Sequence, residues 1–357
     1  MNGVTALVLM LVVSGPTMTN DPPAGEPPIG EPPIGEPPAA RAPAASAGQT
    51  IPMPTLGGPQ FWGDVVLRSG WRIQRNALSG HHRLIDPLNL QHAAGTKGHC
   101  LAVLESPAIA AKAPRMSGEV TLLIHGILRG SGSMGPIGRR LEGAGLQPLR
   151  WDYPSTRGTI DDAAALLAEA IDSLGPEVTR INFVVHSMGG LVVRAYGGCT
   201  GDQTPPCDPR LGRLVMLGTP NHGAEMATHL QNFGPFNLLF GPAGREMTHD
   251  GEVIARLPLP PCEFGIVAGI RGTGSGYNPL IPGDDDGTVT LASARLGGAS
   301  DFLAVRGLHS FLMSHPAVVD AVEHYLQTGA FRPNAPRQPI PAAAAAAGQS
   351  GSRSGGR

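Results

Sequence analysis

One stretch decides the fold of this chain of 357 residues: Arg180-Ile-Asn-Phe-Val-Val-His-Ser-Met-Gly-Gly-Leu-Val-Val-Arg-Ala-Tyr196. A short apolar run stops at Ser187, and helical spacing of apolar residues begins directly after it. The sequence therefore predicts a buried strand, a sharp turn and a helix. Gly189 and Gly190 leave room around this turn, whereas Val185 stands where a glycine is usual. A serine on such a turn is lifted clear of the sheet, which is typical of a nucleophile.

From Glu119 onward, strand patterns alternate with helix patterns. Besides the stretch above, the expected strands are 120–124, 147–152, 213–217, 264–268 and 302–305, and the expected helices are 134–144, 160–174 and 317–326. Residues 57–105 indicate a pair of edge strands with turns. This alternation predicts an α/β fold, with a mostly parallel sheet and helices on both faces. Ligands of such sheets bind at the carboxyl ends of the strands, where Ser187 is expected.

The two ends of the chain differ from its middle in composition. Residues 4–13 form an uncharged apolar run, too short to span a bilayer, which predicts a signal for export over residues 1–15. Residues 16–56 contain Gly-Glu-Pro-Pro three times, and residues 333–357 include six consecutive alanines. Both compositions favour disorder. The folded domain is therefore expected over residues 57–332.

Charge and cysteine content narrow the function classes. The net charge of -2 and the lack of a dense basic block argue against nucleic acid as a partner. The four cysteines are Cys100, Cys199, Cys207 and Cys262. Cys199 and Cys207 bracket a short polar loop and are the expected disulfide pair, with buried free thiols as the alternative. Neither their number nor their spacing fits a zinc site, and no metal or other cofactor is expected.

A serine hydroxyl is a weak nucleophile that needs a base, and the base needs a carboxylate to orient it. In this fold class the partners follow in the order serine, acid, histidine. His309 lies between the last strand and the last helix and is the expected base, with His315 as the alternative. In the turn Gly283-Asp-Asp-Asp-Gly-Thr-Val289, Asp286 is favoured over Asp285 as the acid because it directly precedes Gly-Thr-Val. The three aspartates also fit an acidic surface turn or part of a calcium site.

The negative oxygen of a tetrahedral intermediate needs preorganised N–H donors. We expect one from the main chain of Met188, directly after the serine, and one from Ile127, in the loop after strand 120–124. An ordinary turn at His125-Gly126 is the alternative. A dinucleotide site is a further alternative, because Gly130-Ser-Gly-Ser-Met-Gly135 fits G-x-G-x-x-G. In such a site the first glycine ends the strand, whereas here His125 to Arg129 lie between the end of the strand and Gly130. This spacing argues against a dinucleotide site.

Five motifs occur in an order that resembles the α/β-hydrolase superfamily, specifically bacterial lipase-like and esterase-like serine hydrolases. They are His125-Gly126, the elbow His186-Ser-Met-Gly-Gly190, Gly218-Thr-Pro-Asn-His-Gly223, Asp286-Gly-Thr-Val289 and His309. The segment Gly57-Gly-Pro-Gln-Phe-Trp62 is similar to a leader of exported members of that group. The resemblance covers about residues 57–332.

This resemblance implies an α/β-hydrolase fold and a serine hydrolase that cleaves esters. It implies Ser187 as nucleophile, Asp286 as acid and His309 as base. The oxyanion donors would be the main-chain N–H groups of Met188 and Ile127. Thioester hydrolysis and acyl transfer use the same triad, and a non-catalytic binding protein of this fold is the remaining alternative.

The segment between Asn221 and Arg256 predicts a small cap insertion over the site. It contains Phe233-Gly-Pro-Phe-Asn-Leu-Leu-Phe240, which would line an acyl pocket or move as a lid. A helix that packs on the sheet is the alternative. We therefore expect a small-molecule or lipid ester as substrate, with transient contact to a lipid surface. No oligomer is implied.

Overall fold

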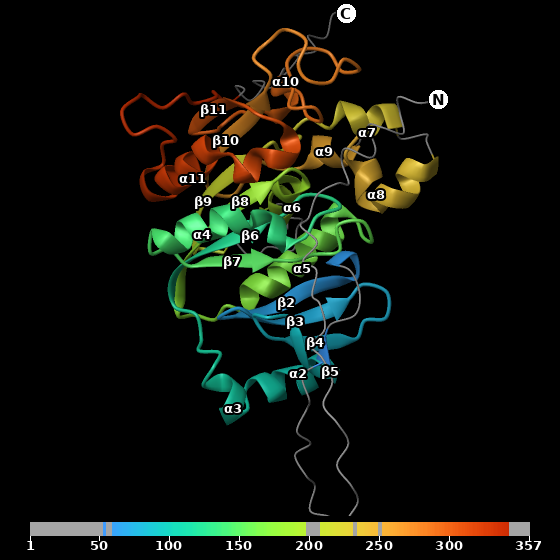
Figure 1. Ribbon diagram of the computed structural model, residues 1–357, viewed down its shortest axis with the longest axis vertical. Helices are drawn as coiled ribbons and strands as arrows, with labels where there is room; N and C mark the ends of the chain where they lie inside the picture. Colours follow the sequence, from blue (N-terminus) through green and yellow to red (C-terminus); the bar gives the residue numbers. More distant parts are fainter. Residues whose placement is uncertain (1–52, 55–58, 198–207, 231–233, 249–251, 343–357) are drawn as a thin grey trace, which may run out of the picture. The chain divides into compact units, whose positions relative to one another are not determined.

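The computed structural model describes residues 53–54, 59–197, 208–230, 234–248 and 252–342 (Figure 1). Its central feature is a six-stranded sheet in the order β11-β10-β9-β8-β6-β7, in which every neighbouring pair is parallel. The strands are β6 (Gly118–Ile124), β7 (Pro148–Trp151), β8 (Val178–His186), β9 (Leu211–Leu217), β10 (Glu263–Ile270) and β11 (Asp301–Arg306). Each lies where the apolar pattern of the sequence predicts a buried strand.

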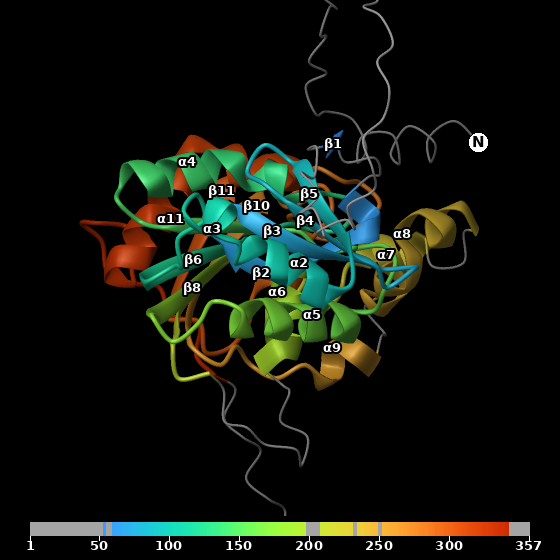
Figure 2. The same cartoon turned by 90° about the horizontal axis from the view of Figure 1, so that it is seen from below.

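Helices cover both faces of this sheet. Figure 2 shows α4 and α11 on one side and α5 and α6 on the other. Their bounds are α4 (Gly135–Gly143), α5 (Ile160–Asp172), α6 (Met188–Gly197) and α11 (Pro316–Thr328). The predicted fold class is therefore confirmed: a parallel sheet between two layers of helices.

The main core lies between the sheet and the pair α4 and α11. Leu123, Val184 and Val215, from three neighbouring strands, are fully buried against Ile137 of α4 and Tyr325 of α11. Fully burying an aliphatic side chain of this size contributes roughly 1.5–3 kcal/mol. This packing fixes the sheet edge on which the loops of the candidate site stand.

The N-terminal region forms a second, antiparallel sheet in the order β1-β5-β4-β3-β2. Its elements are β1 (Met53–Pro54), η1 (Pro59–Phe61), β2 (Trp62–Arg68), β3 (Trp71–Asn76), β4 (His82–Ile85) and β5 (Leu90–Gly95), followed by α2 (Lys97–Leu104) and α3 (Pro107–Ala110). We predicted only a pair of edge strands here. Ser69 and Gly70, both with positive φ, form the two-residue turn between β2 and β3. Local patterns predict such strands, but they do not predict that the strands pair in a separate sheet.

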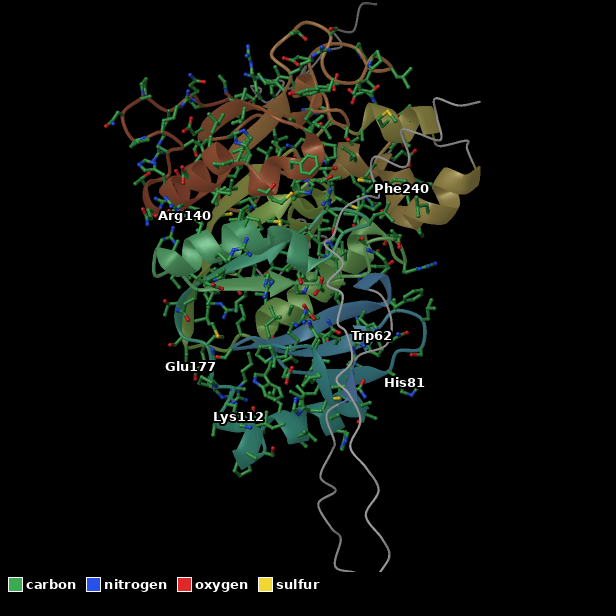
Figure 3. All side chains as sticks on the ribbon, viewed as in Figure 1. Trp62, His81, Lys112, Arg140, Glu177 and Phe240 are labelled. Atoms are coloured by element: carbon green, nitrogen blue, oxygen red, sulfur yellow. The ribbon has the colours of Figure 1, made fainter. Side chains whose placement is uncertain are left out.

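In the described part of the insertion between β9 and β10 there are three helices: α7 (Glu225–Leu230), α8 (Gly234–Glu246) and α9 (Glu252–Arg256). Helix α8 breaks at Gly241, which has φ +65°. A Cβ there would lie 1.9 Å from the carbonyl oxygen of Thr156, so glycine is required for α8 to approach that loop. Phe240 of α8, which is labelled in Figure 3, is buried. Phe233 and the side chain of Phe236 lie outside the described part of the chain.

The folded part of the chain extends past residue 332, where we predicted its end. Ile340 donates its N–H to the carbonyl oxygen of Ala299 at 2.9 Å and accepts from the N–H of Gly298 at 2.8 Å. A proline- and alanine-rich composition favours disorder on average, but it does not exclude an extended segment that finds main-chain partners. The described structure therefore continues past the predicted boundary.

Two further predictions concern residues outside the described structure. Cys199 and Cys207, the expected disulfide pair, lie outside the described residues, and so does the predicted export signal. Cys100 is a buried free thiol. Among the helices that are described, none is both long and apolar enough to cross a bilayer.

Candidate active site

Ser187 stands on a sharp turn between β8 and α6. It has φ +54°, a left-handed conformation that is rare for residues other than glycine. Its N–H donates to the carbonyl oxygen of Leu217 at the end of β9, at 2.9 Å. Backbone strain of this kind costs about 1–3 kcal/mol and persists only where the surrounding structure over-determines it. The serine is thus held at the carboxyl end of the sheet.

The residues around the turn explain its unusual sequence. A Cβ on Gly190 would lie 2.2 Å from the hydroxyl of Thr219, and one on Gly189 would lie 2.9 Å from the carbonyl oxygen of His125. Small residues are therefore required downstream of the serine. Val185 is buried within β8 and pairs with strands on both sides, so the turn forms without a glycine at that position.

The structure brings Ser187, His309 and Asp286 together in one line. His309 Nε2 lies 3.0 Å from Ser187 Oγ, and His309 Nδ1 lies 2.8 Å from Asp286 Oδ2. The three side chains come from the elbow, from the segment after β10 and from the start of η3 (His309–Ser314), and all three residues are buried. In this geometry the imidazole can take the serine proton while the carboxylate holds its ring orientation.

Asp286 is fixed on its other side by the main chain. Its Oδ1 accepts the N–H groups of Thr288, at 3.1 Å, and Val289, at 2.8 Å. Its carbonyl oxygen accepts the N–H of His309 at 2.8 Å. These bonds orient the carboxylate so that only Oδ2 faces the imidazole.

Asp285 has a different role in the same turn. Its Oδ1 accepts the N–H groups of Tyr277, Asn278 and Gly287 at 3.1, 3.0 and 2.6 Å. Burial raises the pKa of its carboxyl group, and Oδ2 has no hydrogen-bond partner among the described residues. Asp286, and not Asp285, therefore faces His309.

The first glycine of the motif Gly218-Thr-Pro-Asn-His-Gly223 makes room for the acid and the base. Gly218, at the end of β9, has φ +57°. A Cβ there would lie 3.0 Å from His309 Nδ1 and 3.2 Å from Asp286 Oδ2. Because Gly218 has no side chain, the carboxylate and the imidazole can meet directly above it.

The loop after β6 approaches the serine closely enough to hold an oxyanion donor. A Cβ on Gly126 would lie 2.9 Å from Ser187 Cβ. Leu128 has φ +60° and donates its N–H to Ser155 Oγ at 3.1 Å. The N–H of Ile127 has no acceptor among the described residues. It is therefore available to a ligand, as is expected of an oxyanion donor, and Met188 begins α6 directly after the serine.

Sequence reasoning missed the role of His186, which precedes the nucleophile. Its Nε2 donates to the carbonyl oxygen of His309 at 3.0 Å, and its Nδ1 has no partner among the described residues. Burial, followed by the neighbouring His309 and Arg129, lowers the pKa of His186 well below its usual value. The ring is therefore neutral and supports the main chain of the base. His315, the alternative base, directly precedes α11 as its N-cap residue. His324 lies within α11, and its Nδ1 donates to the carbonyl oxygen of Ala330 at 2.6 Å.

The buried neutral state of His186 predicts how stability depends on pH. Below pH 6.5 the unfolded state binds a proton that the folded state excludes, so the free energy of unfolding falls as the pH falls. This one group contributes a slope of up to about 1.4 kcal/mol per pH unit. In His186→Gln we expect the free energy of unfolding to depend less steeply on pH. Between pH 6.5 and 5.5 the variant should therefore lose about 1 kcal/mol less of its free energy of unfolding than the wild type loses. Urea unfolding at both pH values measures this, and parallel curves would refute the prediction.

The acidic turn does not gather the ligands of a metal site. Among the described residues, no three His, Cys, Asp or Glu side chains are arranged to hold a metal ion. The alternative glycine motif for a dinucleotide, Gly130 to Gly135, contains η2 (Ser131–Met134), where Ser131 donates its main-chain N–H and its hydroxyl to Asp152. Those groups are therefore already engaged within the chain.

Comparison with known proteins gives structural similarity only. No protein-family model and no curated protein matches the chain. Solved structures that match it include lipases and esterases. The propeptide form of a Bacillus licheniformis lipase is 20% identical over 54% of this chain and 47% of its own, with a TM-score of 0.44.

Two other solved structures have similar values. The phospholipase PlaB from Legionella pneumophila is 16% identical over 60% of either chain, with a TM-score of 0.46. A metagenomic carboxyl esterase is 17% identical over 60% of this chain and 77% of its own, also with a TM-score of 0.46. The match thus spans about half of the Bacillus lipase and three fifths of PlaB.

Proposed function

We propose that this protein is a serine hydrolase that cleaves carboxylic esters through an acyl-enzyme. The observation that carries the proposal is the unbroken line from Ser187 Oγ through His309 to Asp286, at 3.0 and 2.8 Å, on a strained turn at the carboxyl end of the sheet. A hydroxyl in a merely structural position needs neither the strain nor a buried imidazole and carboxylate behind it.

In the proposed reaction, Ser187 Oγ attacks the ester carbonyl carbon while His309 Nε2 takes the hydroxyl proton. Asp286 stabilises the imidazolium and keeps Nδ1 protonated. The oxygen of the tetrahedral intermediate is stabilised by the N–H groups of Ile127 and Met188. His309 then gives its proton to the departing alcohol. Water, activated by the same imidazole, releases the acid and regenerates the serine.

Apolar groups near the site favour an ester with an apolar acyl part, including lipid esters. Leu308 and Phe311 lie within two residues of His309 in the sequence and are 42% and 53% exposed. On the cap side, a Cβ on Gly244 would lie within 3.8 Å of both Phe240 and Ile127, so α8 borders the oxyanion loop. The exposed side chains of Leu308 and Phe311 are also suited to transient contact with a lipid surface. Thioesters and acyl transfer to an alcohol would use the same residues.

We further propose that the protein is exported, with residues 1–15 as the signal. The support is the uncharged apolar run at residues 4–13. Expression of the full chain in a bacterial host, followed by mass determination of the periplasmic or secreted product, would show a shortened N-terminus if the proposal holds.

The test of the proposed activity is a fluorophosphonate probe on the purified protein, with Ser187→Ala in parallel. We expect one adduct on the wild type, seen as a single increase in intact mass, and none on the variant. Hydrolysis of p-nitrophenyl esters of graded acyl length would then define the acyl preference, and matched thioesters the leaving group. A folded wild type with neither adduct nor turnover would refute the proposal.

A further inference from the structure

The oxyanion loop, residues 126–131, is held by a side chain from the N-terminal region of the chain. Gln60 lies in η1, directly before strand β2 of the antiparallel sheet. Its Nε2 donates to the carbonyl oxygen of Arg129 at 3.0 Å. Its Oε1 accepts the hydroxyl groups of Ser155 and Thr156 at 2.9 and 3.0 Å. One glutamine therefore joins the oxyanion loop to the loop after β7.

The direction of each hydrogen bond follows from the chemistry of the groups. The carbonyl oxygen of Arg129 can only accept, so the amide nitrogen of Gln60 must face it. The Ser155 hydroxyl already accepts the N–H of Leu128 at 3.1 Å, so its own proton is free to point to Gln60 Oε1. The bonds form a chain that starts at the N–H of Leu128 and returns to the carbonyl oxygen of Arg129.

These linked hydrogen bonds determine which N–H groups of the oxyanion loop are available to a ligand. Leu128 has the strained φ of +60°, and its N–H is satisfied by Ser155. The preceding N–H, that of Ile127, has no acceptor among the described residues. Without Gln60, the Ser155 hydroxyl loses its acceptor and the loop loses its bond at Arg129. The loop then becomes free to relax from the strained turn.

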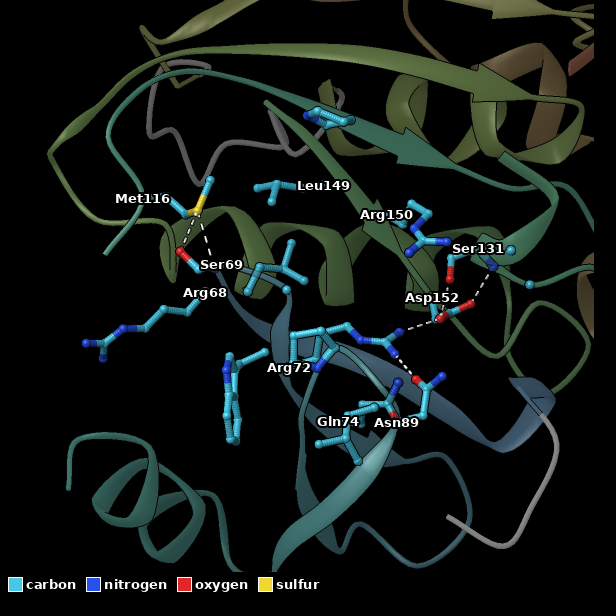
Figure 4. A pocket seen from close by; sticks show the side chains of 18 of the residues that line it. Arg68, Ser69, Arg72, Gln74, Asn89, Met116, Ser131, Leu149, Arg150 and Asp152 are labelled. Carbon is cyan, nitrogen blue, oxygen red and sulfur yellow. Dashed lines mark hydrogen bonds and ion pairs between the residues drawn. The ribbon is translucent and has the colours of Figure 1, made fainter. Parts of the chain in front are cut away.

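The far end of the same loop is also tied to the N-terminal sheet (Figure 4). Asp152, which follows β7, accepts the N–H of Ser131 at 2.6 Å and its hydroxyl at 2.7 Å. Arg72 of β3 forms an ion pair with Asp152 at 2.7 Å. The Asp152 N–H donates to Asp64 of β2 at 2.7 Å. Burial opposes ionisation of Asp152, but His125, Arg72 and the Ser131 bonds together lower its pKa, so the carboxylate stays charged.

We propose that Gln60 is a positioning residue of the oxyanion hole, and that the N-terminal sheet thereby forms part of the catalytic apparatus. The inference rests on the proposed ester hydrolysis at Ser187. Gln60 does not touch the reacting atoms. It acts through the loop that presents the Ile127 N–H, so its removal lowers the rate of the chemical step more than it weakens substrate binding.

The test compares Gln60→Ala with Gln147→Ala. Gln147 is a matched control because its Nε2 also donates to main-chain oxygens, those of Ser117 and Glu119, at 2.9 and 3.1 Å, but at the amino end of β6. For Gln60→Ala we expect kcat to fall about 10- to 100-fold with KM changed less than threefold. For Gln147→Ala we expect both constants within about twofold of wild type. Steady-state hydrolysis of one p-nitrophenyl ester by all three proteins gives these values.

Two further measurements separate positioning from packing. A boronic acid forms a tetrahedral adduct with the serine, and one of its oxygens occupies the oxyanion hole. Its inhibition constant should therefore rise in Gln60→Ala by the same factor by which kcat/KM falls. Gln60→Glu fills the same volume but cannot donate to Arg129 when ionised, so at pH 8 it should be as slow as Gln60→Ala.

The outcomes distinguish this inference from the proposed function. An active wild type with Gln60→Ala and Gln60→Glu as fast as Gln147→Ala would overturn the inference and leave the esterase proposal intact. A Gln60→Ala variant with lower kcat but unchanged boronate inhibition would also overturn it. A wild type without esterase activity would overturn the proposed function and this inference with it.

Discussion

Replacing Asp286 by asparagine should lower kcat about 10⁴-fold without unfolding the protein. The reason lies in the three bonds that the carboxylate accepts. Its Oδ1 receives the N–H groups of Thr288 and Val289, which only an oxygen can accept. In the variant, the amide oxygen therefore stays there and the NH₂ group turns to His309 Nδ1. Nδ1 must then accept a hydrogen bond, so the ring proton lies on Nε2, the nitrogen that faces Ser187. A protonated Nε2 cannot take the proton of the serine hydroxyl.

Asp285→Asn is the matched control, one residue away. The amide oxygen can replace Oδ1, which accepts three N–H groups, while the amide nitrogen takes the place of Oδ2, which has no partner among the described residues. We expect kcat within about threefold of wild type and a small change in melting temperature. Ester hydrolysis and thermal unfolding of both variants measure the difference. If Asp286→Asn kept a tenth of the wild-type kcat, or if Asp285→Asn lost as much, Asp286 would not be the acid.

Most of the fold could be predicted from local patterns of apolar residues. These patterns did not predict structure where strand pairing depends on residues that are distant in the sequence. The strand ending at Ile124, the helix beginning at Ile160 and the elbow are each encoded in fewer than twenty consecutive residues, and the structure places all three as expected. The N-terminal sheet is different. Its strands follow from alternation, but the contact of Asp64 with Asp152 joins residues 88 positions apart and leaves no local signal.

In the candidate site, too, some residues could be predicted from the sequence and others could not. Ser187 and His309 could be predicted because each comes shortly after a strand end, and strand ends of a parallel sheet meet at one edge. Asp286 could be predicted from its turn motif in the longer segment after β10. Gln60 could not, because its contact with Arg129 is a single bond across 69 positions. The only signal was the leader motif Gly57 to Trp62, which contains it. His186 is within the elbow motif, but its bond to the main chain of His309 depends on the folded arrangement.

Gly126→Ala tests the closest contact between the oxyanion loop and the nucleophile. The added Cβ would lie 2.9 Å from Ser187 Cβ and 2.9 Å from His186 Nδ1, and both neighbours are buried in the elbow. Because the elbow is held by the sheet, the loop must move outward, and it carries the Ile127 N–H away from the developing charge. A lost oxyanion donor lowers kcat about 10²- to 10³-fold, which is the effect we expect.

Gly132→Ala provides the control in the same loop region, because a Cβ at Gly132 meets nothing within 4 Å. Alanine there should leave kcat within about twofold of wild type. Steady-state hydrolysis and thermal unfolding of both variants distinguish a displaced donor from general destabilisation. A displaced donor lowers kcat at temperatures where Gly126→Ala is still folded, whereas destabilisation lowers only the amount of active protein. Gly126→Ala with the kcat of Gly132→Ala would mean that the loop tolerates the methyl group, and that its N–H groups do not bind the oxyanion from the position described.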